Sequence, residues 1–233
     1  MTVLLALDDT DMPDTPGTGR LAREIAAAVQ ACYPVSGITR HQLLVDPAIP
    51  YTSHNSSAVI HVEAEPSAIE DLGGVARDLV LERHAPGSDP GIAVADGDAV
   101  SPAVVAFGQD AKRCVLTQEH ALRLGRNAGL LLEALGGSGG GVIGALAGIG
   151  LAATRSDGRY LELGSIRSLG GETTVEAALA AGIAGVATLD GRAVTGGRLV
   201  CERGKGPKPA VVQGRAVLFV EACGDGWRAL RRD

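Results

Sequence analysis

Several features common in secreted, zinc-binding and nucleic-acid-binding proteins are scarce in this 233-residue chain. Its four cysteines form no Cys-x-x-Cys pair, which excludes a zinc ribbon and provides no disulfide framework. Aromatic residues make up 3%, too few for the stacking platforms that bind single-stranded nucleic acid. The net charge of −6 creates no overall field that attracts nucleic acid. The first residues lack a basic segment and a long apolar run, so we expect no signal peptide, no membrane span and a cytoplasmic location.

The residues that are abundant indicate a folded protein with many turns. Hydrophobic residues make up 45% of the chain and its mean hydropathy is +0.17, values typical of a well-buried core. The 33 glycines are about twice the usual share, so we expect many turns or close backbone approaches. The sequence leaves the oligomeric state open.

An apolar run at residues 3–7 leads directly into the acidic sequence Asp8-Asp9-Thr10-Asp11. The run is typical of a buried strand. Carboxylates crowded at a strand end repel one another unless a cation or ordered donors hold them, and hard oxygen ligands suit Mg²⁺. The sequence therefore predicts a metal site at Asp8, Asp9 and Asp11. The alternative is an acidic turn whose side chains cap the next helix.

The following segment, Gly17-Thr18-Gly19, precedes a run of apolar residues at helical spacing that ends at Cys32. Unpaired amides and the helix dipole favour an anion at such a helix start, so we expect Thr10, Gly17 and Gly19 to contribute to a phosphate site at which Thr18 lies. The alternative is that Thr18 only caps the helix. No Gly-Lys-Ser/Thr follows, which excludes a Walker A loop.

A second candidate phosphate loop lies in the glycine-rich segment 136–150. Glycines at Gly139, Gly140 and Gly141 allow a backbone to approach a phosphate closely and direct amides at it. The alternative is a flexible linker before a small-residue helix, in which Gly144 and Gly148 allow close packing.

Between the strands predicted at residues 38–45 and 58–62 runs a loop rich in short polar groups. Two prolines favour extended backbone before them. We interpret the loop as a substrate-binding loop, and an ordinary connection rich in turn formers is the alternative. The residues that it would present are Tyr51, Ser53, His54 and Asn55.

The remaining periodicity predicts an α+β protein. Strand–helix–strand units in the first half favour a ferredoxin-like layer. The predicted helices are at residues 66–81, 103–111, 117–124, 126–135, 142–147 and 173–181. Further strands are predicted at residues 92–95, 151–154, 160–166, 186–189, 193–194, 198–201 and 216–220.

Five segments resemble, in order, the amino-terminal half of the archaeal isoleucine-tRNA agmatinylcytidine synthetase family over residues 1–167. The resemblance implies an ATP-dependent kinase-like domain combined with a ferredoxin-like domain, and it implies that Thr18 is phosphorylated during catalysis. The segments are Leu7-Asp8-Asp9-Thr10-Asp11, Gly17-Thr18, Asp46-Pro47-x-Ile49-Pro50-Tyr51, Asp89-Pro90-Gly91 and Gly141-Val142-Ile143-Gly144-Ala145-Leu146-Ala147.

This sequence also departs from the family pattern. The family continues into an OB-fold and a cysteine zinc ribbon that bind tRNA, and we expect this chain to lack both. A Lys-Thr-Arg-like stretch usually follows the family's counterpart of Tyr51, whereas this chain has Thr52-Ser53-His54, and it has Gly19 where the family has threonine. We therefore expect no tight tRNA binding by this chain alone, and a small-molecule or protein acceptor that the sequence does not name.

Together these features predict a kinase-like α/β module with a ferredoxin-like layer and a small β-rich C-terminal extension. Residues 1–64 and 136–170 would form the nucleotide-binding part, residues 65–135 the ferredoxin-like and helical part, and residues 171–233 the extension. The predicted activity is that of an ATP- and Mg²⁺-dependent phosphotransferase, in which Asp8, Asp9, Asp11 and Thr18 are catalytic. The alternative is a non-catalytic nucleotide-binding or tRNA-modification accessory module.

Overall fold

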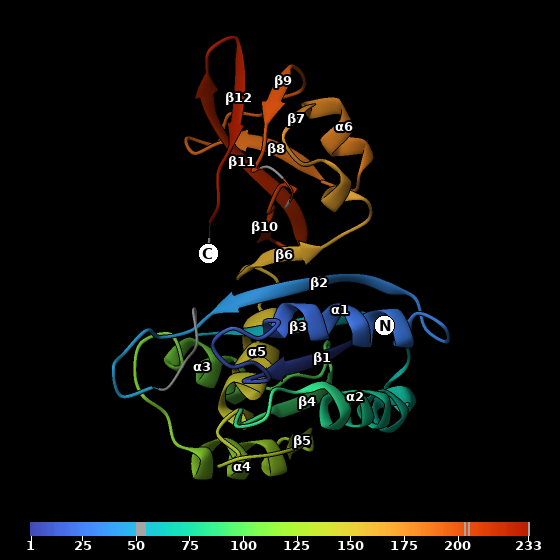
Figure 1. The fold of residues 1–233 in the computed structure, drawn as a ribbon, viewed down its shortest axis with the longest axis vertical. Coiled ribbons are helices and arrows are strands. Elements are labelled where there is room, and N and C mark those ends of the chain that lie inside the picture. Colours follow the sequence, from blue (N-terminus) through green and yellow to red (C-terminus); the bar gives the residue numbers. More distant parts are fainter. Residues whose placement is uncertain (50–54, 203, 205, 233) are drawn as a thin grey trace. The chain divides into compact units, whose positions relative to one another are not determined.

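The computed structural model describes residues 1–49, 55–202, 204 and 206–232 (Figure 1). The chain divides into two compact units, Met1–Thr154 and Arg155–Asp233. Residues 65–135 thus belong to the same unit as the acidic loop and the glycine-rich segment. The functional division predicted from the sequence stays a prediction. No helix among the described residues is long and apolar enough to cross a membrane.

The N-terminal unit is built on an antiparallel sheet in the order β5-β4-β1-β3-β2. The chain enters it as β1 (Thr2–Asp8), α1 (Thr18–Val29), β2 (Val35–Gln42), β3 (Ser56–Glu63), the one-turn 3₁₀ helix η1 (Pro66–Ala68), α2 (Ile69–Arg83) and β4 (Gly91–Asp96). Then come α3 (Pro102–Asp110), α4 (Gln118–Asn127), β5 (Leu131–Ala134) and α5 (Val142–Ala153). The predicted strands 3–7, 58–62 and 92–95 are confirmed.

Helices cover both faces of this sheet (Figure 1). Helices α1 and α2 pack on one face, and α5 crosses the other with α3 and α4 outside it. Leu4 and Ala6 point to the α5 side, where they share a core with Leu146 and Ile149. Successive strand residues alternate between faces, so the intervening residues of β1 face α1 and α2. Burial on both faces explains why residues 3–7 are continuously apolar.

Two sequence predictions in this unit are wrong, and the strand predicted at 193–194 in the other unit is only an isolated bridge at Ala193. A strand is predicted at residues 151–154, but residues 151–153 continue α5. Glycines allow that helix to lie tightly between the sheet and α3, since a Cβ at Gly148 would come within 2.4 Å of Ser57 Oγ. Residues 126–135, predicted as a helix, contain the end of α4 and the strand β5. Gly129 takes a positive φ of 67° and ends α4, the usual role of a glycine after a helix.

The C-terminal unit has a mixed sheet with strand order β6-β10-β11-β12-β9-β7, and β8 pairs in parallel with β11. Its elements are β6 (Arg159–Glu162), η2 (Ile166–Ser168), β7 (Glu172–Thr174), α6 (Val175–Ala180), β8 (Gly185–Thr188), β9 (Arg198–Val200), β10 (Ala210–Val212), β11 (Arg215–Cys223) and β12 (Gly226–Ala229). Leu218 and Val220 of β11 share a core with Val175 and Ala178 of α6. The short strands predicted at 186–189, 198–201 and 216–220 are confirmed.

Candidate functional site

The acidic loop begins where β1 ends. Asp8 is the last residue of β1 and lies opposite Gly91, the first residue of β4. Asp9 follows with a positive φ of 52°, a conformation that Asp tolerates better than most residues. Thr10 is buried, and Asp11 is half-buried. The turn thus places the carboxylates of Asp8, Asp9 and Asp11 at the end of the apolar strand.

Thr18 is held by this loop. It is the first residue of α1, whose N-cap is Gly17. The Thr18 hydroxyl donates to Asp11 Oδ1 at 2.7 Å, and its backbone N–H donates to the same oxygen at 3.3 Å. Thr10 Oγ1 donates to Thr18 Oγ1 at 3.1 Å. Thr18 therefore does not cap the helix with its side chain; Asp11 supplies an acceptor to the helix start.

The glycine-rich segment meets the acidic loop at the start of α5. A Cβ at Gly144 would lie 1.7 Å from Asp8 Oδ2, and a Cβ at Gly141 would lie 2.4 Å from the Asp89 carbonyl oxygen and 3.0 Å from that of Asp8. No side chain fits at either position without displacing those groups. The glycines therefore bring the first turn of α5 against the ends of β1 and the loop before β4.

The amides of the predicted phosphate loop are largely used inside the protein. The Gly139 N–H donates to the Gly136 carbonyl at 3.0 Å, and the Gly141 N–H donates to the Asp89 carbonyl at 2.9 Å. The carbonyl of Gly140 accepts the N–H of Ile143. The loop is therefore a closed turn with its own hydrogen bonds rather than a flexible linker.

Sequence reasoning did not assign Asp89 and Ser138 to the site. The Asp89 carboxylate accepts the Ser138 N–H at 2.7 Å and the Ser138 hydroxyl at 2.5 Å. Asp89 stood in one of the segments that carry the family resemblance, and Ser138 interrupts the glycine run. The sequence alone does not show that Asp89 and Ser138 are in contact, because the two residues are 49 positions apart in the chain.

Two carboxylates at this end of the sheet, Asp8 and Asp9, have raised pKa values. Burial raises the pKa of Asp8 well above its usual range, and the nearby charges of Asp9 and Asp11 raise it further. Burial also raises the pKa of Asp9 to about 6, with additional contributions from the charges of Asp89 and Asp11. In the described part of the chain, no three His, Cys, Asp or Glu side chains are grouped closely enough to hold a metal ion by themselves. The metal assignment of Asp8, Asp9 and Asp11 stays a prediction.

The predicted substrate loop is described only at its end. Tyr51, Ser53 and His54 lie outside the described residues. The Asn55 side-chain amide donates to the Leu44 carbonyl at 2.7 Å, so this residue ties the loop back to the segment after β2. Its role toward a substrate stays a prediction.

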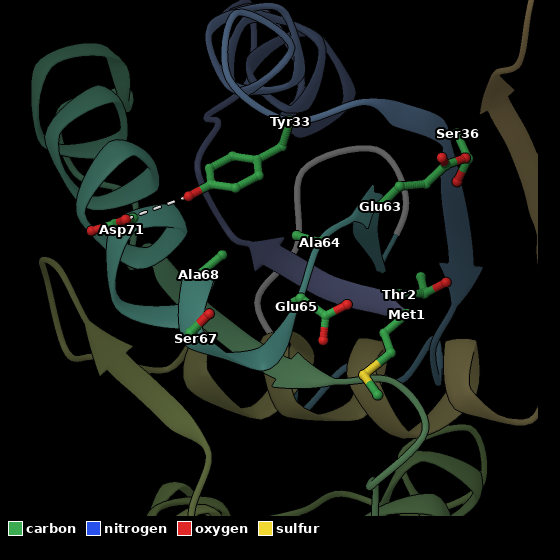
Figure 2. Close-up of a pocket in the computed structure, with 10 residues that line it drawn as sticks. All are labelled: Met1, Thr2, Tyr33, Ser36, Glu63, Ala64, Glu65, Ser67, Ala68 and Asp71. Atoms are coloured by element: carbon green, nitrogen blue, oxygen red, sulfur yellow. Dashed lines mark hydrogen bonds between the residues drawn. The ribbon is translucent and has the colours of Figure 1, made fainter.

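A separate open pocket of about 730 Å³ lies at the other end of β1 (Figure 2). Met1 and Thr2, at the start of that strand, line it together with residues from the end of β3 and from α2. The Tyr33 hydroxyl donates to Asp71 Oδ2 at 3.4 Å at its rim (Figure 2). None of the predicted site residues lines this pocket, so it is distinct from the acidic and glycine-rich loops.

Comparisons with known proteins find similarity only among solved structures. No protein-family profile and no curated protein matches the chain. A tRNA fluorescent labeling enzyme is 26% identical with a TM-score of 0.56, and TiaS in complex with an isoleucine tRNA and ATP is 25% identical with a TM-score of 0.55. TiaS with the same tRNA, AMPCPP and agmatine is 25% identical with a TM-score of 0.54.

Each of these matches covers 64% of this chain and 36% of the neighbour. The chain therefore spans little more than a third of the length of the proteins that it resembles. The matches support a TiaS-like fold, in agreement with the resemblance read from the sequence.

Proposed function

We propose that the N-terminal unit binds ATP with Mg²⁺ between the acidic loop and the start of α1, and that it transfers the terminal phosphate in a reaction related to tRNA modification. The observation that carries this proposal is the 2.7 Å hydrogen bond from the Thr18 hydroxyl to Asp11 at a helix N-terminus. A hydroxyl paired with a carboxylate is the arrangement of an activated nucleophile, and a helix N-terminus favours phosphate.

The hydrogen-bond directions at Thr18 fit a nucleophile. An ionised carboxylate only accepts, so the Thr18 proton points to Asp11 and the Thr10 hydroxyl must donate to Thr18. In the proposed step, Thr18 Oγ1 bonds to the γ-phosphorus, the bond from that phosphorus to the bridging oxygen breaks, and ADP leaves. The Thr18 proton passes to Asp11. Catalysis of this kind depends mainly on positioning and charge neutralisation.

The residues present fit Mg²⁺. Asp8 and Asp9 are half-buried carboxylates whose pKa values are raised by burial and by the charges of neighbouring carboxylates, as expected of a site that lacks a counter-charge. Although no three such side chains are grouped among the described residues, Mg²⁺ in nucleotide sites takes only one or two carboxylates and completes its coordination with phosphates and water. When bound, the ion would neutralise charge on the phosphates.

The solved neighbours support a nucleotide ligand, since they include complexes of TiaS with ATP and with AMPCPP. The order strand–helix–strand–strand–helix–strand over β1 to β4, with sheet order β4-β1-β3-β2, supports a ferredoxin-like layer formed by residues 2–96. We propose that α5 and the glycine-rich segment complete this layer as the kinase-like part. The phosphoryl acceptor beyond Thr18 is a tRNA-linked, small-molecule or protein group.

A non-catalytic nucleotide-binding or accessory module is the second candidate. The internal hydrogen bonds of the Gly139 and Gly141 amides favour it, because those amides do not point freely to a phosphate. Steady ATP turnover by the purified chain would exclude it.

The test is transfer of labelled γ-phosphate to Thr18, followed by mass spectrometry of the peptide. We expect label on Thr18 with MgATP, none in Thr18→Val, and label on the new hydroxyl in Thr18→Ser. Thr15→Ala is the matched control, because Thr15 is an exposed threonine of the same loop that bonds only to the Met12 backbone among its described contacts. Equal ATP turnover in Thr18→Val and the wild type would refute the proposed role of Thr18.

A further inference from the structure

Asp89 connects the two loops that the proposed function uses. Its side chain accepts both hydrogen bonds from Ser138, at 2.7 and 2.5 Å. Its carbonyl accepts the Gly141 N–H at 2.9 Å. Its charge also lies close enough to Asp9 to raise the pKa of the Asp9 carboxyl. One residue thus bonds the glycine loop through its carbonyl and its carboxylate, and its charge lies close to the acidic loop.

The glycine loop is shaped around this carboxylate. Gly137 has a positive φ of 54°, and a Cβ there would lie 1.7 Å from Asp89 Oδ1. A Cβ at Gly140 would lie 3.6 Å from Asp89 Oδ2. Gly137 therefore provides the space that the Asp89 side chain fills, whereas the distance at Gly140 is an ordinary van der Waals contact.

The segment that carries Asp89 is itself tied to the acidic loop. The Ala85 N–H donates to the Thr10 carbonyl at 2.9 Å, and the Ser88 hydroxyl donates to the Ala85 carbonyl at 2.8 Å. Residues 85–90 therefore form a bridge whose ends are bonded to both loops. A displacement of Asp89 would shift the loops relative to each other.

We infer that Asp89 is a positioning residue, which holds the glycine loop in the conformation that receives the phosphates of a nucleotide. The inference rests on the proposed nucleotide function. Its physical basis is preorganisation: a loop whose backbone is fixed before binding loses less conformational freedom when the phosphates arrive. Asp89 acts through Ser138 and Gly141 and makes no contact with the nucleotide in this role.

The test uses the full chain and three probes: MgATP, MgAMPCPP and adenosine, which has no phosphate. We expect Asp89→Asn to weaken binding of both nucleotides about tenfold and to leave adenosine binding unchanged, because one charge-assisted hydrogen bond is lost from the loop. Asp96→Asn is the matched control, since Asp96 lies at the other end of β4 and also accepts a backbone N–H, from Asp98. Nucleotide binding equal to the wild type, or equal weakening for adenosine, would overturn the inference.

Hydrogen exchange without nucleotide provides a readout that does not depend on the proposed function. We expect the amides of Ser138 and Gly141 to exchange about tenfold faster in Asp89→Asn. Ser138→Ala is the second variant, because Ser138 is exposed and its loss spares the fold while removing one of the two side-chain bonds. Unchanged exchange in both variants would refute the positioning role, whereas failure of the wild-type chain to bind MgATP would refute the proposed function instead.

Discussion

Replacement of Asp9 by asparagine should stabilise the fold and remove the function. Asp9 is half-buried with a φ of 52°, a conformation that Asn adopts as readily as Asp. An asparagine side-chain oxygen keeps the acceptor capacity of one carboxylate oxygen. The substitution therefore changes the charge and little else.

The magnitude follows from the pKa of Asp9, which burial and the charges of Asp89 and Asp11 raise from 3.8 to about 6. Without screening, this rise in pKa corresponds to about 3 kcal/mol against the charged form. Solvent reaches part of this carboxylate and screens the repulsion, so we expect Asp9→Asn to raise the free energy of unfolding by about 1–2 kcal/mol near neutral pH.

The gain should depend on pH. Because the pKa of Asp9 is higher in the folded state, its charged form destabilises the fold above about pH 6, and the effect disappears below the unfolded value of 3.8. The stability difference between Asp9→Asn and the wild type should therefore be largest near pH 7.5 and should shrink as the pH falls towards 4.

Urea unfolding at about pH 7.5 and pH 4.5 measures this difference, and the same titration with MgATP measures the loss of function. At about 100 times Kd, MgATP should add about 2.7 kcal/mol to the wild type and nothing to Asp9→Asn. Asp14→Asn is the control, an exposed aspartate of the same loop with a similar φ of 69°, and it should change stability by less than about 0.5 kcal/mol. A destabilised Asp9→Asn, or a gain that does not shrink in acid, would refute the electrostatic reasoning; an intact MgATP effect would refute the metal assignment.

Three further predictions concern packing, titration and RNA. Gly144→Ala should destabilise the fold by about 3 kcal/mol in urea unfolding, because its Cβ would come within 1.7 Å of the Asp8 carboxylate, whereas Gly74→Ala, with nothing within 4 Å, should stabilise α2 by about 0.5–1 kcal/mol. Burial and the nearby His41 lower the pKa of His61 to about 3. The free energy of unfolding should therefore fall as the pH drops below about 6.5, by up to about 1.4 kcal/mol per pH unit, and His61→Gln should make it less dependent on pH. In a gel shift the chain alone should bind tRNA only non-specifically, with Kd of about 10⁻⁴ to 10⁻⁶ M at physiological salt, and tight sequence-selective binding would contradict this.

Local sequence patterns determined the elements whose period is clear. The apolar run at 3–7 predicts β1 because it is short, continuous and followed directly by turn formers, and the spacing of Leu21, Ile25 and Val29 predicts α1 because those residues share one helical face. The small residues of α5 carry no such period. Its extension to Ala153 depends on neighbours that only the folded chain supplies, such as Ser57 beneath Gly148.

The candidate site divides in the same way. The sequence by itself determined that carboxylates follow β1 and that Thr18 lies at a helix start. Both features depend only on residues that are close together in the chain. Only the tertiary structure decided that Asp11, rather than solvent, accepts the Thr18 hydroxyl. It also decided that Asp89 joins the two loops. Antiparallel pairing places Gly91 opposite Asp8. This register brings Asp89, in the loop before β4, between the acidic loop and the glycine-rich segment, which are both far from it in the sequence.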